Sequence, residues 1–196
     1  MSDTAQTKRG RGRPRSQASE DAILGATLKL LAEGGYNAVT VDKVAAMASA
    51  SKTTIYRRWP TKENLVIAAF ELTELLTVPR KRKMVDNLVE IIWQFSQFMQ
   101  NTPLGGVLPA LAAERQHNPE LDEALAPLMK SRREPLIAVI ERGLEKGELI
   151  PGTDPEFVAD LCMGPVEIRG VTLHMPVTKK YIQQVVDTAL ASLLTK

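Results

Sequence analysis

The stretch that decides the fold runs from residue 40 to residue 65 and reads TVDKVAAMASASKTTIYRRWPTKENL. Three of its hydroxyl side chains stand where helices begin, because Ser or Thr accepts a hydrogen bond from the free N–H groups of a first helical turn. These residues are Thr40, Ser51 and Thr61. They predict short helices over residues 41–48 and 52–59, and a longer helix after residue 61. Since only Ser49 and Ala50 stand between the first short helix and the cap of the second, the pair is a helix-turn-helix candidate.

The second short helix, residues 52–59, has an unusual distribution of side chains. Ile55 and Trp59 lie four residues apart, so they share one face and anchor the helix to a core. The other positions carry hydroxyl groups and cations, namely Lys52, Thr53, Thr54, Tyr56, Arg57 and Arg58. Such groups suit phosphate oxygens and base edges. The alternative is an ordinary solvated face, but that normally includes carboxylates, and residues 52–59 contain none.

This stretch resembles the TetR family of transcriptional regulators. In that family a Thr opens the second helix, and Ser-x-x-Thr-Ile/Leu-Tyr and then Lys-Glu-x-Leu follow. The matching residues are Thr40, Ala45, Ala48, Ser51, Thr54, Ile55, Tyr56, Lys62, Glu63 and Leu65. Ser49 departs from the usual Gly in the turn, and Trp59 stands where Phe is common. A Ser in a left-handed turn costs about 1 kcal/mol, which the fold can absorb.

The resemblance implies roles for the residues of this unit. Contacts to the DNA backbone are expected from Thr40, Thr54, Tyr56 and Lys62. Contacts to base edges are expected from Lys52, Thr53, Arg57 and Arg58, since Arg can fork onto guanine. Ser51 belongs to the same interface, whereas Trp59 is expected in the core.

The N-terminal arm gives a second signal, because residues 8–15 read KRGRGRPR. The centre of this run, Arg11 to Pro14, resembles an AT-hook. Glycines let an extended chain enter a narrow minor groove, and Arg11 and Arg13 would meet its negative potential. The alternative is a nonspecific basic arm. Either role adds phosphate affinity and salt dependence.

Charge separates the front of the 196-residue chain from the rest. Residues 1–65 carry a net charge of +5 and residues 66–196 a net charge of −3. A basic front on an acidic body predicts a polyanionic partner for the front only. Residues 80–83, RKRK, are the basic exception in the body, and they are either a solvated linker or an extra contact to the DNA backbone.

Composition excludes several classes of protein. One cysteine and two histidines leave little for a disulfide framework, a metal site or acid–base chemistry. The motifs G-x-S-x-G and H-E-x-x-H and the phosphate-binding loop are missing. No apolar leader or membrane span is visible. We therefore expect a cytoplasmic protein that is not an enzyme, has no cofactor and does not bind membranes.

The remaining sequence predicts an all-α fold of about nine helices. We expect a disordered arm over residues 1–18, a helix-turn-helix domain over residues 19–65, and a C-terminal ligand-binding and dimerisation domain over residues 66–196. Ser19 is expected to cap the first helix, and Gly34-Gly35 to end it. A helix is expected from Leu104 to Arg115. Pro127 and Pro135 predict a kink or break in the helix that starts after Asn118.

The last two predicted helices, about 155–174 and 178–194, carry more apolar surface than one core face needs. Pairing across a two-fold axis would bury it, although packing within one chain is the alternative. The candidate ligand-binding residues are Trp93, Phe98, Met99, Leu111, Arg115, Met129, Arg133, Met163 and Val166. Aromatic and methionine side chains at helical spacing more often form plain core than a ligand site. If they do line a pocket, the ligand is apolar or amphipathic.

Together these features predict a homodimeric, ligand-responsive regulator of transcription. It would bind palindromic double-stranded DNA as a repressor and leave its operator when a small apolar or amphipathic molecule binds. The alternative is an architectural or nonspecific DNA-binding protein without an inducer.

Overall fold

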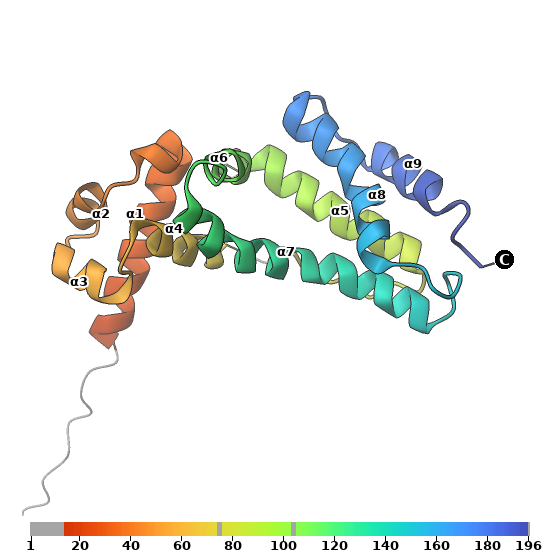
Figure 1. Cartoon of the computed structure of the whole chain (residues 1–196), viewed down its shortest axis with the longest axis horizontal. Helices are drawn as coiled ribbons and strands as arrows, with labels where there is room; N and C mark the ends of the chain where they lie inside the picture. Colours follow the sequence, from red (N-terminus) through yellow and green to blue (C-terminus); the bar gives the residue numbers. More distant parts are fainter. Residues whose placement is uncertain (1–13, 74–75, 103–104, 196) are drawn as a thin grey trace, which may run out of the picture.

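A computed structural model describes residues 14–73, 76–102 and 105–195, and this part of the chain is built from helices (Figure 1). The helices are α1 (Pro14–Ala38), α2 (Val41–Met47), α3 (Lys52–Arg58), α4 (Lys62–Glu71), α5 (Met84–Asn101), α6 (Val107–Glu114), α7 (Pro119–Glu145), α8 (Pro155–Glu167) and α9 (Lys179–Leu190). A π-helical turn, Ile168–Thr172, continues α8. The all-α fold is confirmed. We call α1–α4 the head and α5–α9 the body.

The three predicted caps start the short helices of the head. Thr40 accepts a hydrogen bond from the backbone N–H of Lys43 at 3.3 Å, and Ser51 accepts one from Thr54 at 3.1 Å. Thr61 does the same for Asn64 at the start of α4, at 3.2 Å. Each cap satisfies one of the N–H groups that a first turn leaves without a helical partner. The helix boundaries in this region therefore follow directly from local sequence.

The turn between α2 and α3 adopts the conformation that glycine usually provides. Ser49 has φ of 50°, in the left-handed region. Hydrogen bonds on both sides of Ser49 hold the turn in this left-handed conformation. The N–H of Ala48 donates to the carbonyl of Val44, and the N–H of Ala50 donates to the carbonyl of Ala45. The departure from the family pattern at this position therefore leaves the helix-turn-helix intact.

The first helix differs from its prediction at the start. It begins at Pro14 rather than after Ser19, so part of the arm that was expected to be disordered is helical. Proline is favourable in a first helical turn because it has no N–H to satisfy. The sequence predicts that Gly34-Gly35 ends this helix; the backbone is non-helical at both residues, with φ of 67° at Gly35, but helical geometry resumes beyond them and α1 reaches Ala38.

Two hydrophobic cores hold the molecule together. The first joins the head to α6 and to the first half of α7 through Leu121, Leu125 and Leu128. The second joins α5, α8 and α9 to the other half of α7. With 27 residues, α7 is about 40 Å long. Figure 1 shows it running from beside the head to the far end of the body. It is therefore the mechanical link between the two cores.

The sequence predicts a kink or a break in α7, and the structure shows no break. The helix continues from Pro119 to Glu145 with Pro127 and Pro135 inside it. An internal proline costs about 3 kcal/mol because one backbone hydrogen bond is lost. Burial of leucine side chains on both sides of each proline offsets that cost.

Two other helices of the body differ in length from their predictions. The helix predicted from Leu104 to Arg115 is shorter, and α6 spans Val107–Glu114. The helix predicted to run toward His174 changes to π-helical geometry at Ile168, three residues after Pro165. His174 ends this segment with φ of 50°.

Candidate DNA interface and effector cavity

Helix α3 lies at the outer end of the head and presents two different faces (Figure 1). Ile55 is fully buried and Trp59 is 9 % exposed, so these two side chains attach α3 to the head core. On the other face Thr53, Tyr56 and Arg57 are exposed, and Tyr56 keeps 49 % of its surface in solvent. A large aromatic side chain left in solvent beside a cation is suited to packing against a nucleic acid backbone.

The two other cations of α3 are held by carboxylates of the head. Lys52 pairs with Asp42 of α2, and this hydrogen bond raises the pKa of Lys52. Both side chains are largely exposed, so the pair is weak and Lys52 can exchange Asp42 for a phosphate. Arg58 pairs with Glu20 of α1 at 3.4 Å, and its side chain is only 23 % exposed. Among the predicted base-contacting residues, Arg57 is thus presented outward and Arg58 is directed toward α1.

Lys62 is placed differently from the cations of α3. Its ammonium group lies 3.8 Å from the ring centroid of Tyr36, and partial burial lowers its pKa. Tyr36 in turn donates a hydrogen bond to Glu63, the next residue of α4. Lys62 therefore contributes to the packing of α4 on α1. Its predicted contact to the DNA backbone stays a prediction.

The hydroxyl groups predicted to contact DNA all stand at or near helix starts. Thr40 and Ser51 are exposed caps, and the Ser51 and Thr54 hydroxyl groups lie 2.8 Å apart. Arg11 and Arg13 of the basic arm lie outside the described residues.

A polar network connects the start of α4 to the start of α7. Asn118 caps α7 by accepting from the N–H of Leu121 at 3.0 Å. Its amide group also donates to Glu63 at 3.3 Å and to the Tyr36 hydroxyl at 3.4 Å. Burial raises the pKa of Glu63, but the hydrogen bonds from Tyr36 and Asn118 outweigh it and lower the pKa below its usual value.

A second contact between the same helices lies at the other end of α4. Arg132 of α7 donates to the carbonyl of Phe70 at 2.6 Å, and to the carbonyl and hydroxyl of Thr73 at 3.1 and 2.6 Å. Burial lowers the pKa of this guanidinium group. We call the Asn118 and Arg132 contacts together the α4 clamp. Sequence reasoning missed the clamp, because its partners are 55–82 residues apart.

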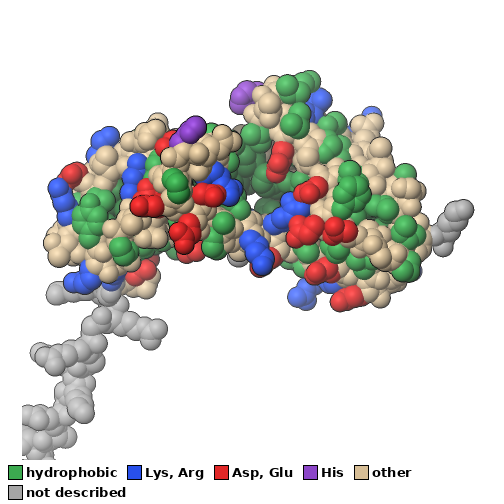
Figure 2. Space-filling model, viewed as in Figure 1, with side chains coloured by type: hydrophobic (Ala, Val, Ile, Leu, Met, Phe, Trp, Pro, Cys, Tyr) green, Lys and Arg blue, Asp and Glu red, His purple; other side chains and the backbone are tan. Residues whose placement is uncertain are grey.

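A cavity of about 670 Å³ lies inside the body and reaches the end of α4. Figure 2 shows a hollow between the head and the α8 end of the body, with hydrophobic side chains in its walls. The walls come from α4, α5, α6, α7, α8 and the π-helical turn. They include the predicted residues Phe98, Met99, Met129, Arg133 and Met163. The volume lies within the range of about 300–1,000 Å³ that is usual for small-molecule sites.

Four of the predicted ligand-binding residues are not in the cavity wall. Leu111 is fully buried in the first core and Val166 is 2 % exposed in the second. Trp93 packs against the second core, and Arg115 is held by Asp122. Conversely, sequence reasoning missed wall residues from distant segments, among them Phe70, Thr73, Phe95, Leu108, Arg132 and Val171. The apolar pattern marks a buried face but does not say whether another side chain or a void lies opposite.

The charged groups in the cavity wall are largely paired. Arg133 binds Glu156 and Asp160 of α8, with Nε 2.6 Å from the Glu156 carboxylate. Arg132 is engaged by the α4 clamp. Burial raises the pKa of Glu167, and only the nearby Arg133 opposes that effect. The wall therefore offers mainly apolar surface together with one carboxyl group whose pKa is raised.

The chain has one cysteine, Cys162, and it lies in α8. The thiol of Cys162 is buried, and burial raises its pKa to about 11, which makes it a poor nucleophile. Within the described ranges, no group of three or more His, Cys, Asp or Glu side chains is arranged to hold a metal ion. No helix in the same ranges has the length and apolar character needed to cross a bilayer.

The described fold is thus that of an all-α protein with an N-terminal helix-turn-helix head and a cavity-bearing helical body. Residues 23–69 match the family "Bacterial regulatory proteins, tetR family", and residues 78–189 match "Tetracyclin repressor-like, C-terminal domain". The chain belongs to the TetR family of transcriptional regulators.

Similar proteins cover nearly the whole chain. The HTH-type transcriptional regulator YdeS of Bacillus subtilis is 34 % identical over 186 residues, with 91 % of each chain covered. The DNA-binding transcriptional repressor TetR of Mycobacteroides abscessus is 28 % identical, covering 92 % of this chain and 96 % of that one. The crystal structure of the TetR family transcription regulator SCO0332 has a TM-score of 0.73 and 26 % identity, covering 90 % and 99 %. These relatives are regulators of transcription rather than enzymes.

Proposed function

We propose that this regulator is a homodimeric repressor that leaves a palindromic operator when a small apolar or amphipathic molecule enters the body cavity. The observation that carries the proposal is the position of the cavity against the end of α4. Phe70 of α4, Thr73 just after it, and Arg132 of the α4 clamp are wall residues. A ligand in the cavity therefore touches the last helix of the head.

The proposed release works through the two ends of α4. A ligand that pushes on Phe70 competes with the contacts of Arg132 to Phe70 and Thr73. Because Asn118 holds Glu63 at the other end, α4 is displaced at one end and retained at the other. Such a tilt moves α1 and α3, which share the core of α4. Ligand and DNA would then favour different head positions, which couples the two sites.

The proposed dimer uses the outer face of α8 and of the π-helical turn that continues it. Phe157 is 55 % exposed, Leu161 is 36 % exposed and Ile168 is 55 % exposed. Spacings of four and seven residues place these side chains along one face. Contact between two copies would bury this face, in line with the predicted role of the last two helices. Two copies are also needed to place two α3 helices in successive major grooves about 34 Å apart.

The polar groups of the wall favour an effector that is not anionic. The two arginine side chains are already engaged by carboxylates, carbonyls and a hydroxyl. Glu167 would repel a carboxylate when it is ionised, and when protonated it donates a hydrogen bond to an acceptor on the ligand. We therefore propose an uncharged, mainly apolar molecule with one polar group, which suits a wall that is apolar apart from a few polar side chains.

The test begins with genome-wide recovery of DNA fragments bound by the full chain. Affinity for a recovered fragment is then measured by fluorescence anisotropy at about 0.15 M salt, against random DNA of the same length. Preference for the fragment by about 10³ or more supports sequence-specific regulation. Equal affinity for random DNA would support the nonspecific alternative and reject the proposal.

Release is tested with a panel of uncharged apolar compounds on the recovered fragment. Met163→Trp fills the cavity, so this variant is expected to bind DNA normally but to stop responding to an active compound. Met175→Trp is the matched control, because Met175 is exposed and does not line the cavity. If Met163→Trp still releases DNA at the same compound concentration, the effector does not act from this cavity.

A further inference from the structure

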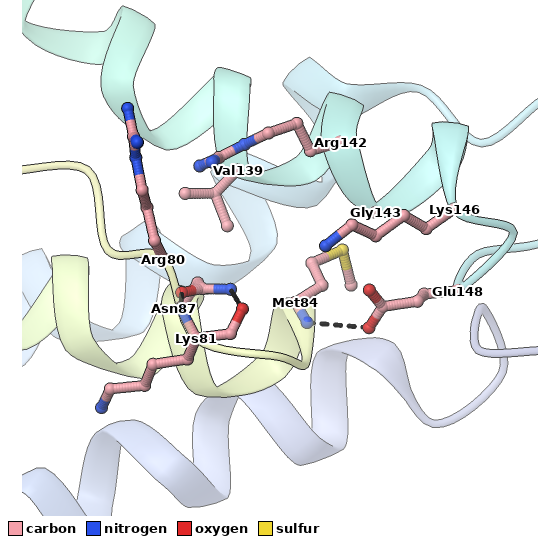
Figure 3. Close-up of a pocket in the computed structure, with 9 residues that line it drawn as sticks. All are labelled: Arg80, Lys81, Met84, Asn87, Val139, Arg142, Gly143, Lys146 and Glu148. Carbon is pink, nitrogen blue, oxygen red and sulfur yellow. Dashed lines mark hydrogen bonds between the residues drawn. The ribbon is translucent and has the colours of Figure 1, made fainter.

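A second pocket lies at the far end of the body, where the chain entering α5 meets the last turns of α7 (Figure 3). Its volume is about 320 Å³. Its lining shares no residue with the effector cavity and consists of Arg80, Lys81, Met84, Asn87, Val139, Arg142, Gly143, Lys146 and Glu148. Figure 1 places it at the opposite end of the molecule from α3, so the basic segment 80–83 is remote from the predicted DNA interface.

The pocket has an excess of positive charge. Its one carboxylate, Glu148, accepts a hydrogen bond from the backbone N–H of Met84 at 2.7 Å. Lys81 binds Glu90 at 2.9 Å, and Figure 3 shows its amino group directed away from the pocket. The other charged side chains of the lining are the cations Arg80, Arg142 and Lys146. None of these three has an ion-pair partner within the described part of the chain.

Arg142 carries a buried donor that no acceptor satisfies. Its Nε atom donates to the carbonyl of Ala138 at 3.1 Å. Its Nη2 atom is buried and has no hydrogen-bond partner among the described residues. A buried N–H group without an acceptor costs about 1–3 kcal/mol, so such groups are normally paired in folded proteins. An acceptor entering the pocket would remove this cost.

The position of Arg142 and Lys146 near the C-terminal end of α7 has a simpler consequence, because cations there stabilise the helix dipole. That effect does not account for Arg80, which comes from a different segment. Figure 3 shows the Arg80 side chain extending toward α7, on the side where Arg142 lies. Two guanidinium groups from separate elements thus face one small volume.

The segment that carries Arg80 is held in place by Asn87. The Asn87 side chain accepts from the N–H of Lys81 at 2.6 Å and donates to the carbonyls of Lys81 and Lys83 at 3.0 and 2.8 Å. Asn87 is itself only 6 % exposed. The backbone beside Arg80 is therefore fixed before any ligand binds, which lowers the entropic cost of binding.

We propose that this pocket binds a phosphate group, either free or carried by a small metabolite. Guanidinium groups match the oxygen geometry of phosphate and donate in pairs, and an ammonium group adds a point charge. The occupied pocket would connect the segment entering α5 to the end of α7. This site is independent of the effector cavity and does not require the proposed release mechanism.

The experiment measures the thermal unfolding of the full chain while inorganic phosphate is titrated, with sodium chloride at the same ionic strength as reference. Glycerol 3-phosphate is titrated in parallel to distinguish a free phosphate from a phosphate ester. A ligand that binds the folded state raises Tm in a saturable manner. The expected result is saturation with at least one of the two probes and no comparable rise with chloride.

Variants separate the pocket from the basic arm, which also attracts anions. Arg142→Gln is expected to raise the apparent Kd at least tenfold. Lys130→Gln, an exposed change on the same helix, is expected to leave it unchanged. Arg80→Gln changes an exposed segment, and it is expected to raise the apparent Kd in the same way if Arg142→Gln proves unstable. The proposal is overturned if neither probe shifts Tm more than chloride does, or if Arg142→Gln and Arg80→Gln bind as tightly as the unsubstituted chain.

Discussion

The DNA-reading head and the effector cavity differ in the range over which sequence determines them. In the head, the caps, the turn and the exposed face of α3 are all specified within residues 40–65. In the body, the cavity wall is assembled from segments between residues 70 and 172. Short-range signals therefore describe the head well, whereas the cavity depends on how distant helices pack. The expected effects of substitutions follow this difference.

The largest expected effect concerns the basic arm. Removing residues 1–15 deletes five cations from each chain of the proposed dimer. Each lost phosphate contact lowers the slope of log K against log salt by about 0.9, so operator affinity should fall by about a hundredfold and the slope should flatten. Fluorescence anisotropy on a recovered operator fragment at several salt concentrations measures both quantities. An unchanged slope would show that the arm does not contact DNA.

The next largest effect is a difference between substitutions at two neighbouring arginine residues of α3. Arg57→Ala should lower operator affinity about 10–100-fold and relax preference at one base pair, since a forked contact to guanine contributes about 1–3 kcal/mol. Arg58→Ala should mainly lower thermal stability, because Arg58 binds Glu20 within the head. Comparing affinity and Tm for the two variants tests the assignment. If Arg58→Ala shifts base preference more than Arg57→Ala, the orientation of α3 on DNA differs from the one proposed.

These two arginine residues also show how far sequence reasoning reaches. Residues 52–59 predict a cationic helix without carboxylates, but they do not say which cation is taken by a carboxylate from another helix. Glu20 is 38 positions before Arg58, and no local pattern connects the two. The same limit applies to the clamp, where Arg132 meets Phe70 and Thr73. Helix starts and the exposed face are local properties, whereas partners across helices require the packed structure.

The cavity illustrates the limit more strongly. Met163 and Val166 lie on the same helix, and both carry the apolar signal of a ligand site. Met163 lines the cavity, while Val166 is 2 % exposed in a filled core. Periodicity predicts that each side chain is buried, but it does not predict whether that side chain faces a cavity or other side chains. Five of the nine predicted residues, Phe98, Met99, Met129, Arg133 and Met163, line the wall for this reason, and the other four do not.

A third prediction concerns the clamp. Arg132→Met removes the hydrogen bonds to Phe70 of α4 and to Thr73 just after it, and leaves an apolar stem in place. Hydrogen bonds from charged groups contribute about 1.5–3 kcal/mol, so the free energy of unfolding should fall by about 2 kcal/mol. Urea unfolding measures this loss. The same variant should bind operator more weakly without effector, because α4 is no longer fixed. Stability loss with full operator affinity would mean that the clamp does not position the head.

A smaller effect distinguishes the wall from the filled core. Val166→Ala should lower the free energy of unfolding by about 1–2 kcal/mol and leave effector affinity unchanged, since it opens space in a packed region. Met163→Ala should cost less stability, because its side chain already borders a void, but it should change effector affinity. Urea unfolding and calorimetric titration of the two variants give the comparison. Equal changes in effector affinity would place Val166 in the site after all.

The smallest expected effect is a pH-dependent one at the end of the body. Glu90 accepts hydrogen bonds from Lys179 and Lys81 at 2.8 and 2.9 Å, and these bonds lower its pKa. A carboxyl group with a lowered folded-state pKa contributes stability above its unfolded pKa and loses that contribution as pH falls through the folded pKa. Glu90→Gln should therefore reduce the free energy of unfolding at pH 7 by roughly 1 kcal/mol or less, given its partly exposed partners. The difference from the unsubstituted chain should begin to shrink as pH falls below about 4.3, the ordinary pKa of Glu, and should vanish once pH has passed the lowered folded-state pKa, where Glu90 is neutral in both states. Lys180→Gln is the matched control, because Lys180 is exposed next to Lys179 and has no ion-pair partner among the described residues. A difference that persists unchanged at pH 3 would mean that Glu90 acts through packing, not through its charge.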